Sequence, residues 1–93
     1  MKVIQLDRRF LGHFNYTQKI KLDNELARWR DIYRWASTMY GTLPGYDIYS
    51  KHSKNILYGT SRWGVRHSRG GYYAPEFYFL SKVDVTLFIL ANA

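Results

Sequence analysis

The sequence predicts a single α+β domain, residues 1–93, in which a small antiparallel sheet packs on one main helix. Segments with alternating apolar and polar residues, typical of half-buried strands, flank one long segment with helical periodicity. A length of 93 residues allows one domain, and 46% hydrophobic and 18% aromatic residues are enough for a compact core. A ferredoxin-like arrangement fits this order of elements, as do several other small α+β sheets.

Two strands are expected before the helix. The first covers residues 2–6, a short apolar run rich in β-formers. The second covers residues 13–22, whose alternation places these side chains on the core face: Tyr16, Gln18, Ile20 and Leu22. The other side of this strand is wet and basic and carries Thr17, Lys19 and Lys21.

The main helix is expected to begin near Asp23 or Asn24, either of which can cap it, and to end at Tyr40 before Gly41. Apolar residues at helical spacing form one stripe: Leu22, Leu26, Trp29, Ile32, Tyr33, Ala36, Met39 and Tyr40. Trp35 lies off this stripe. It is either covered by a strand or loop that folds over it or exposed as an anchor for a partner.

Shorter elements are expected after the helix: a turn at 42–45, a short strand at 46–49, a loop at 50–61, and strands at 62–69 and 76–80. In the segment 62–69, one face carries Trp63, Val65 and His67, and the other carries Arg62, Gly64, Arg66 and Ser68. The last segment, 81–93, has β-branched residues that favour a strand. It also has a capping-box pattern from Ser81 and helical spacing of Val83, Leu87, Leu90 and Ala91, which favour a short helix packed on the sheet.

Three segments resemble small accessory proteins of T-even-like tailed bacteriophages. They are the aromatic and basic stretch from Arg9 to Leu22, the run Asp31-Ile-Tyr-Arg-Trp35 that leads to Tyr40-Gly41, and the run from Phe77 to Leu90. The chain departs from the family pattern at Val85 and Ala36, lacks the closing Trp, and has a long insertion between Gly41 and Arg62. The resemblance implies a phage accessory gene product, implies a framework role for Trp35, and points to no catalytic site.

No catalytic or metal-binding pattern is found in the sequence. The histidines, His13, His52 and His67, have no Cys or carboxylate at metal-site spacing, and no serine lies in a nucleophile motif. The glycines form neither a dinucleotide-binding nor a phosphate-binding loop. We therefore expect a protein that is not an enzyme, holds no metal or cofactor, and acts on no small-molecule substrate.

The absence of cysteine favours a reducing compartment, and the longest apolar run, Leu87 to Ala91, is far too short to span a bilayer. We expect a cytoplasmic protein that does not use the membrane. On the phage resemblance, the cytoplasm is that of an infected host cell.

Positive charge is concentrated in one part of the chain. Of a net charge of +7, the segment from Ile48 to Pro75 contributes +5, because it has five Lys or Arg and no acidic residue. Tyrosine and tryptophan are interleaved with these cations. The candidate partner-binding residues are Lys51, Lys54, Arg62, Trp63, Arg66, Arg69, Tyr72 and Tyr73.

Such a surface predicts one of two functions. The first is a phage-type effector that binds and modulates a host protein or nucleoprotein complex with an acidic face. The alternative is direct, largely sequence-independent binding of DNA or RNA. In either case, changing Arg62, Arg66 and Arg69 to Glu is expected to abolish binding without unfolding the domain.

Overall fold

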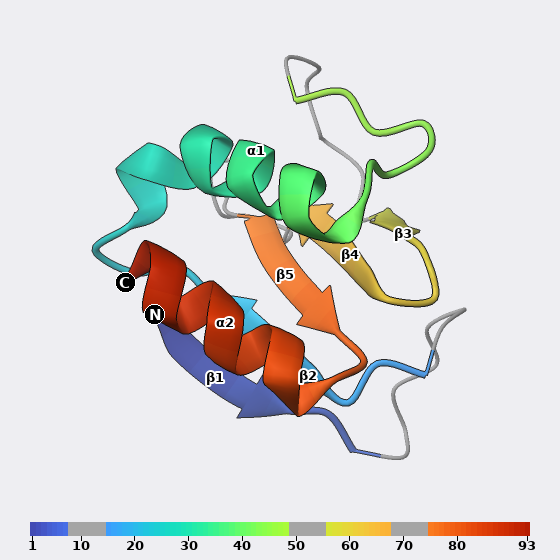
Figure 1. Ribbon diagram of the computed structural model, residues 1–93, viewed down its shortest axis with the longest axis horizontal. Coiled ribbons are helices and arrows are strands. Elements are labelled where there is room, and N and C mark those ends of the chain that lie inside the picture. Colours follow the sequence, from blue (N-terminus) through green and yellow to red (C-terminus); the bar gives the residue numbers. More distant parts are fainter. Residues whose placement is uncertain (8–14, 49–55, 68–74) are drawn as a thin grey trace.

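The computed structural model describes residues 1–7, 15–48, 56–67 and 75–93. Along the chain, these contain β1 (Lys2–Gln5), β2 (Gln18–Lys21), a 3-10 turn η1 (Leu26–Arg28), α1 (Trp29–Tyr40), β3 (Leu57–Gly59), β4 (Trp63–His67), β5 (Pro75–Phe79) and α2 (Lys82–Asn92) (Figure 1). The predicted α+β class is confirmed, with an antiparallel sheet, one main helix and a short C-terminal helix.

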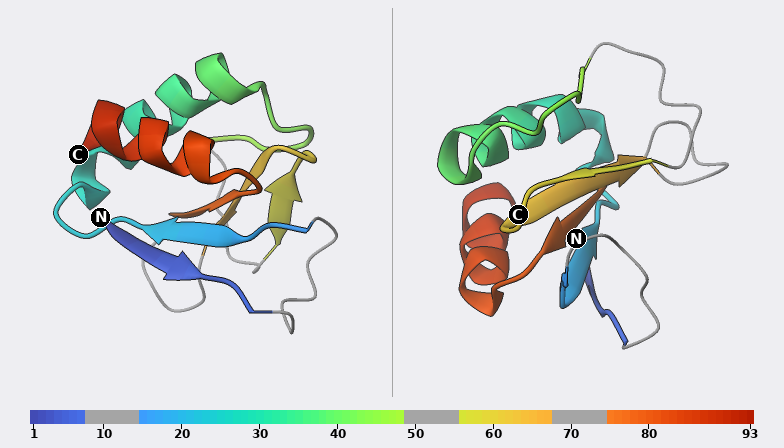
Figure 2. Two further views of the ribbon diagram at one scale, coloured as in Figure 1. Left: turned by 60° about the horizontal axis from the view of Figure 1, so that its bottom comes forward. Right: turned by 90° about the vertical axis from the view of Figure 1, so that its right-hand side faces the viewer.

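The five strands form one sheet in the order β1-β2-β5-β4-β3, and every neighbouring pair is antiparallel. Strand β5 is therefore central. Both helices lie on one side of the sheet, and no described helix lies over the other side (Figure 2). Along the chain, the strands and α-helices follow the order β-β-α-β-β-β-α. This differs from the β-α-β-β-α-β order of a ferredoxin-like fold, which was one of the alternatives left open by the sequence.

Helix α1 buries most of the predicted apolar stripe, with Trp29, Ile32, Tyr33, Ala36 and Tyr40 inside. It ends where predicted, at Gly41, whose φ of 103° suits glycine and whose N–H donates to the carbonyl of Ser37 at 3.0 Å. The expected cap from Asp23 or Asn24 is wrong. The chain enters the helix through η1 instead, and no side chain caps either element.

Three short elements differ from expectation. Residues 46–48 form no strand, and residue 49 lies outside the described part of the chain. The segment expected to be a loop at 50–61 contains β3, which has only three residues and is too short to show alternation. Strand β2 begins at Gln18, so Tyr16 precedes the strand and does not follow its alternation.

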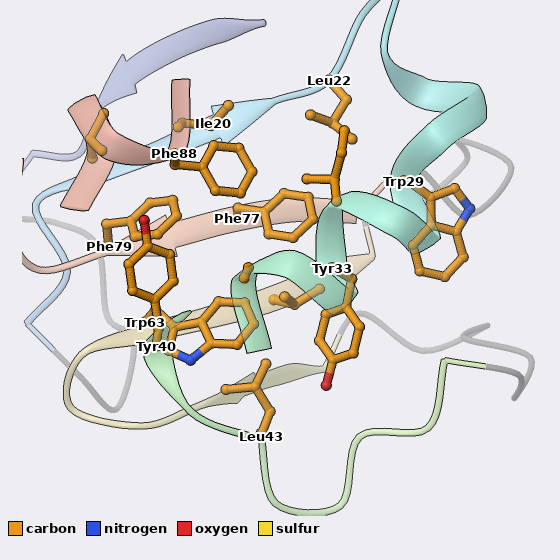
Figure 3. Packing of buried hydrophobic residues seen from close by; sticks show 14 residues of the cluster. Ile20, Leu22, Trp29, Tyr33, Tyr40, Leu43, Trp63, Phe77, Phe79 and Phe88 are labelled. Carbon is orange, nitrogen blue, oxygen red and sulfur yellow. The ribbon is translucent and has the colours of Figure 1, made fainter. Parts of the chain in front are cut away.

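Aromatic rings fill the space between the sheet and the helices (Figure 3). Phe88 of α2 lies against Phe77 and Phe79 of β5, with ring centroids 5.0 and 5.2 Å apart. Trp63 of β4 lies against Tyr33 and Tyr40 of α1, at 5.8 and 5.9 Å. Each helix thus covers a different part of the sheet through its own aromatic contacts.

Trp35 is part of this framework. Its ring meets Tyr40 edge-on at 5.7 Å and Phe88 at 6.1 Å, and it packs against the core while partly buried. The framework interpretation is confirmed, but the covering element is helix α2 and not the expected strand or loop.

The ambiguous segment 81–93 is helical, and Ser81 caps it by accepting a hydrogen bond from the N–H of Val83 at 3.2 Å. The helix does not bury the stripe that the spacing suggested. The residues turned inward are Asp84, Val85, Phe88 and Asn92. The apolar residues turned outward are Val83, Leu87 and Leu90, which are 76%, 37% and 79% exposed. We call these three residues the outer stripe of α2.

Replacing Phe88 by Ala removes a ring that contacts both core phenylalanines of β5. We expect Phe88→Ala to lower the free energy of unfolding by about 3–5 kcal/mol, because a large buried ring leaves a cavity. Leu90→Ala on the same helix is the matched control and should change it by no more than about 0.5 kcal/mol. Urea denaturation of dilute protein measures both, and equal losses would contradict the orientation of α2.

Candidate functional site

Three of the eight predicted site residues can be placed. Arg62, Trp63 and Arg66 belong to or adjoin β4. The other five lie outside the described residues: Lys51, Lys54, Arg69, Tyr72 and Tyr73. The three that can be placed do not share one surface.

Trp63 is a core residue, so its assignment to the partner-binding surface is wrong. It is completely buried, and its indole N–H donates to the carbonyl of Gly41 at 2.9 Å. The alternation of β4 turns Trp63 with Val65 toward the helices. Its role is to fix the end of α1 against the sheet.

Arg62 lies at the helix layer. Its guanidinium donates to both carboxylate oxygens of Asp84 on α2, at 3.0 and 3.2 Å, and lies 4.9 Å from the ring centre of Tyr40. Because Arg62 precedes β4 in a bend, it does not follow the alternation of that strand. The prediction that Arg62 and Arg66 present two guanidinium groups on one strand face is therefore wrong.

Arg66 lies on the side of the sheet away from the helices, where three cations meet the carboxylate of Glu76. The Nζ of Lys19 is 3.0 Å from this carboxylate, and the Nζ of Lys21 and an Nη of Arg66 are both 3.6 Å away. Strand register produces the cluster, since Glu76 of β5 pairs with Lys21 on one side and with Arg66 on the other. The Glu76 side chain is only 4% exposed, so its charge must be compensated locally.

This cluster has more positive than negative charge. Three cations around one carboxylate leave a net charge of +2. Lys2 of β1 extends the row, because it pairs with Lys21, and it brings the total to +3. We call Lys2, Lys19, Lys21 and Arg66 the basic sheet face.

The members of the basic sheet face differ in access. The side chains of Lys19 and Arg66 are 16% and 26% exposed, so they serve mainly to cover Glu76 and Tyr78. Lys21 is 48% exposed, and Lys2 is exposed on the edge strand. Lys2 and Lys21 are thus the members that a partner reaches first.

Tyr78 lies beneath this face. Its ring is 5.9 Å from the Nζ of Lys19, 5.3 Å from the guanidinium of Arg66 and 5.9 Å from the ring of Tyr16. Burial raises the pKa of Tyr78 to about 12, and the neighbouring carboxylate of Glu76 also raises it. The ring is completely buried and offers no stacking surface to a nucleic-acid base.

The side chain of Tyr16 lies against β4 at Gly64, and this close approach explains why the residue at position 64 is glycine. The hydroxyl of Tyr16 donates to the carbonyls of Thr60 and Trp63. A Cβ at Gly64 would lie 2.9 Å from that hydroxyl and 2.8 Å from the carbonyl of Tyr58. Tyr16 is therefore on the same side of the sheet as Tyr78, opposite to the face predicted for it.

Sequence reasoning identified the wet face of Lys19 and Lys21 but did not connect it with Arg66. It also missed Glu76, the residue that joins them. One signal was present: Glu76 interrupts an aromatic strand on the face opposite Phe77 and Phe79. A carboxylate in a strand with that composition requires cations from its neighbours.

The described part of the chain also bears on metal binding and on membrane insertion. No three His, Cys, Asp or Glu side chains gather there in a way that could hold a metal ion. His67 is buried, and its Nε2 lies 2.7 Å from the hydroxyl of Tyr46. No helix within the described ranges is long and apolar enough to cross a membrane.

The raised pKa of Tyr78 predicts a loss of stability in alkali. An unfolded tyrosine ionises near pH 10, whereas Tyr78 in the folded protein has a pKa of about 12. The folded state favours the neutral form of Tyr78. Its contribution to the free energy of unfolding is complete below about pH 10 and is lost as the pH rises from about 10 to about 12. Urea denaturation at a series of pH values should show a smaller alkaline decrease for Tyr78→Phe than for the wild type. Parallel decreases would contradict this prediction, because the variant keeps every other tyrosine and lysine.

Charge reversal at Arg66 is expected to destabilise the fold, contrary to the expectation from sequence that this substitution affects binding alone. Arg66→Glu puts a second carboxylate beside the buried Glu76, which should cost about 2–4 kcal/mol in the free energy of unfolding. Lys2→Glu on the exposed edge strand makes the same charge change and should cost no more than about 0.5 kcal/mol. Thermal and urea denaturation compare the two, and an intact Arg66→Glu variant would show that the cluster is not structural.

Comparison of the chain with protein-family models, with curated proteins and with solved structures finds no match. A functional proposal therefore depends on the residues themselves and on the surfaces that they form.

Proposed function

We propose that the chain is a small non-enzymatic accessory protein that binds an acidic face of a host protein or nucleoprotein complex through the basic sheet face. The observation that carries this proposal is the convergence of three cations on a single carboxylate, on the side of the sheet opposite the two described helices. The phage resemblance supports an accessory role in an infected cell.

The charge pattern supports an acidic partner. Two described carboxylates, Asp84 and Glu76, are each covered by arginine. Lys21 also lies 3.6 Å from Glu76 but is 48% exposed, and Lys2 is exposed on the edge strand. Neighbouring strands lie about 4.8 Å apart, so the Lys2–Lys21 pair presents two positive charges at adjacent strand positions. Exposed charges of this kind guide encounter and partner choice more than they add affinity.

The described aromatic residues favour a protein over a nucleic acid. Binding of single strands without sequence preference uses exposed aromatic rings on which bases stack. In the part of the chain that the structure describes, Trp63 and Tyr78 are completely buried and Tyr58 is partly buried. The described basic sheet face thus contributes cations without a stacking ring.

Neutralising the two accessible lysines should weaken binding and leave the fold intact. Lys2→Gln/Lys21→Gln lowers the net charge from +7 to +5 and keeps Lys19 and Arg66 on Glu76. We expect about tenfold weaker binding, or ~1.4 kcal/mol, measured on the partner recovered by a tagged chain from nuclease-treated host lysate. Arg30→Gln/Arg34→Gln on the outer side of α1 also gives +5 and should bind like the wild type.

Two results would overturn the proposal. One is recovery of no stoichiometric protein from the nuclease-treated lysate, or equal recovery by the wild type and the lysine variant. The other is tight binding to DNA or RNA in fluorescence anisotropy, with a log–log salt slope near −3.6 for four phosphate contacts. Such a slope would show that the basic sheet face binds nucleic acid.

A further inference from the structure

Helix α2 has two apolar sides, and only one of them is used by the fold. Val85 and Phe88 face the core, whereas Val83 and Leu90 are more than three-quarters exposed. The outer stripe of α2, with Lys82 and Thr86, lines an open groove of about 360 Å³. A helix that is apolar on all sides is typical of a covered helix, and exposed apolar patches mark interaction sites.

We infer that the outer stripe of α2 binds the same stripe of a second copy of this chain, with the two helices antiparallel across a two-fold axis. Such an interface must be self-complementary, because each residue meets its counterpart under the same rotation. The spacing of the stripe, at i, i+4 and i+7, has this property.

The positions of Val83, Leu87 and Leu90 along α2 determine where the two-fold axis lies. The midpoint between Val83 and Leu90 falls within about 1 Å of Leu87 along the helix, at ~1.5 Å per residue. One axis therefore sets Val83 against Leu90 of the second copy and Leu87 near its own counterpart. All three exposed apolar residues are covered by a single arrangement.

Charge and polar groups agree with the same arrangement. Lys82 lies at the beginning of α2, and the axis places it beside the last turn of the second copy, near Ala91 and Asn92. The carbonyl end of a helix carries partial negative charge and favours a cation there. The two Lys82 side chains lie about 14 Å apart at ~1.5 Å per residue, which is beyond a Debye length of ~8 Å at physiological salt.

The remaining polar groups of α2 do not oppose the contact. The hydroxyl of Thr86 donates to the carbonyl of Lys82 at 3.0 Å, so burying it leaves this donor satisfied. Asp84 is turned inward and bound by Arg62. Within α2, Lys82 is therefore the single charged side chain on the outer side.

One helical stripe is a small interface. Stable interfaces bury about 800 Å² on each partner, and three side chains supply less. We therefore expect a weak dimer with a dissociation constant on the order of tens of micromolar. The basic sheet face lies on the side of the sheet opposite the helices, so the α2 contact uses none of its residues.

Sedimentation equilibrium of the full chain from about 10 μM to 1 mM spans the dissociation range expected for so small an interface. The average mass should rise from 11.1 kDa toward twice that value. Leu90→Glu should stay monomeric throughout, whereas Met39→Glu, at a 45% exposed position on α1, should behave like the wild type. A wild-type chain that is monomeric at the highest concentration would overturn the inference.

A single cysteine tests the geometry, because the chain has none of its own. A disulfide needs Cα atoms about 4.4–6.8 Å apart, which the axis near Leu87 provides. Leu87→Cys should therefore cross-link on mild oxidation, and the exposed control Thr38→Cys should not. A concentration-dependent dimer whose Leu87→Cys variant fails to cross-link would refute the antiparallel arrangement.

A membrane surface is the competing occupant of this stripe. If the monomeric chain sediments with vesicles of anionic lipid and Leu90→Glu does not, the stripe binds a membrane and the inference is wrong.

Failure of the dimer inference can be distinguished from failure of the proposed function. Leu90→Glu leaves the basic sheet face unchanged, and added salt weakens the charge-driven contact but not an apolar one.

Discussion

The central strand β5 is buried on both sides, and the rest of the structure depends on how each side is covered. On one side, the helices cover Phe77 and Phe79 through Phe88 of α2 and Tyr40 of α1. On the other side, none of the described residues forms a helix over the sheet, and Glu76 is nevertheless almost inaccessible. A buried carboxylate is tolerated only when it is paired, so the adjacent strands must supply cations at the positions that face it. Much of the positive charge on this side is therefore structural.

The helix side is held together by polar contacts as well as aromatic packing. Tyr40 donates its hydroxyl to the carbonyl of Asp84 at 2.9 Å, and Arg62 binds the carboxylate of the same residue. The indole N–H of Trp63 donates to the carbonyl of Gly41, which follows α1. These contacts join α1, α2 and the start of β4 at one point. Arg62 and Trp63, which the sequence suggested as a binding surface, are parts of this junction.

The two candidate surfaces lie on opposite sides of the sheet. The basic sheet face is charged, and the outer stripe of α2 is apolar with one charged neighbour, Lys82. They can be occupied at the same time because they share no residue. Two copies joined through α2 would present two basic faces, and such bivalency raises the avidity for a partner with repeated acidic sites.

By itself, the sequence determined the features that depend on near neighbours along the chain. The 3.6-residue period specified the buried residues of α1 except Met39, which is exposed. Gly41 specified the end of this helix, and the two-residue period of β4 separated Trp63 from Arg66. Tertiary structure decided the rest. Helix α2 has two apolar sides, and periodicity cannot say which one meets the sheet. Glu76 draws its cations from β2 and β4, and the register that brings them together is set by strand pairing between distant segments. Local patterns show which side chains share one side of a helix or strand. Only the packing of segments that are distant in the sequence decides what that side contacts.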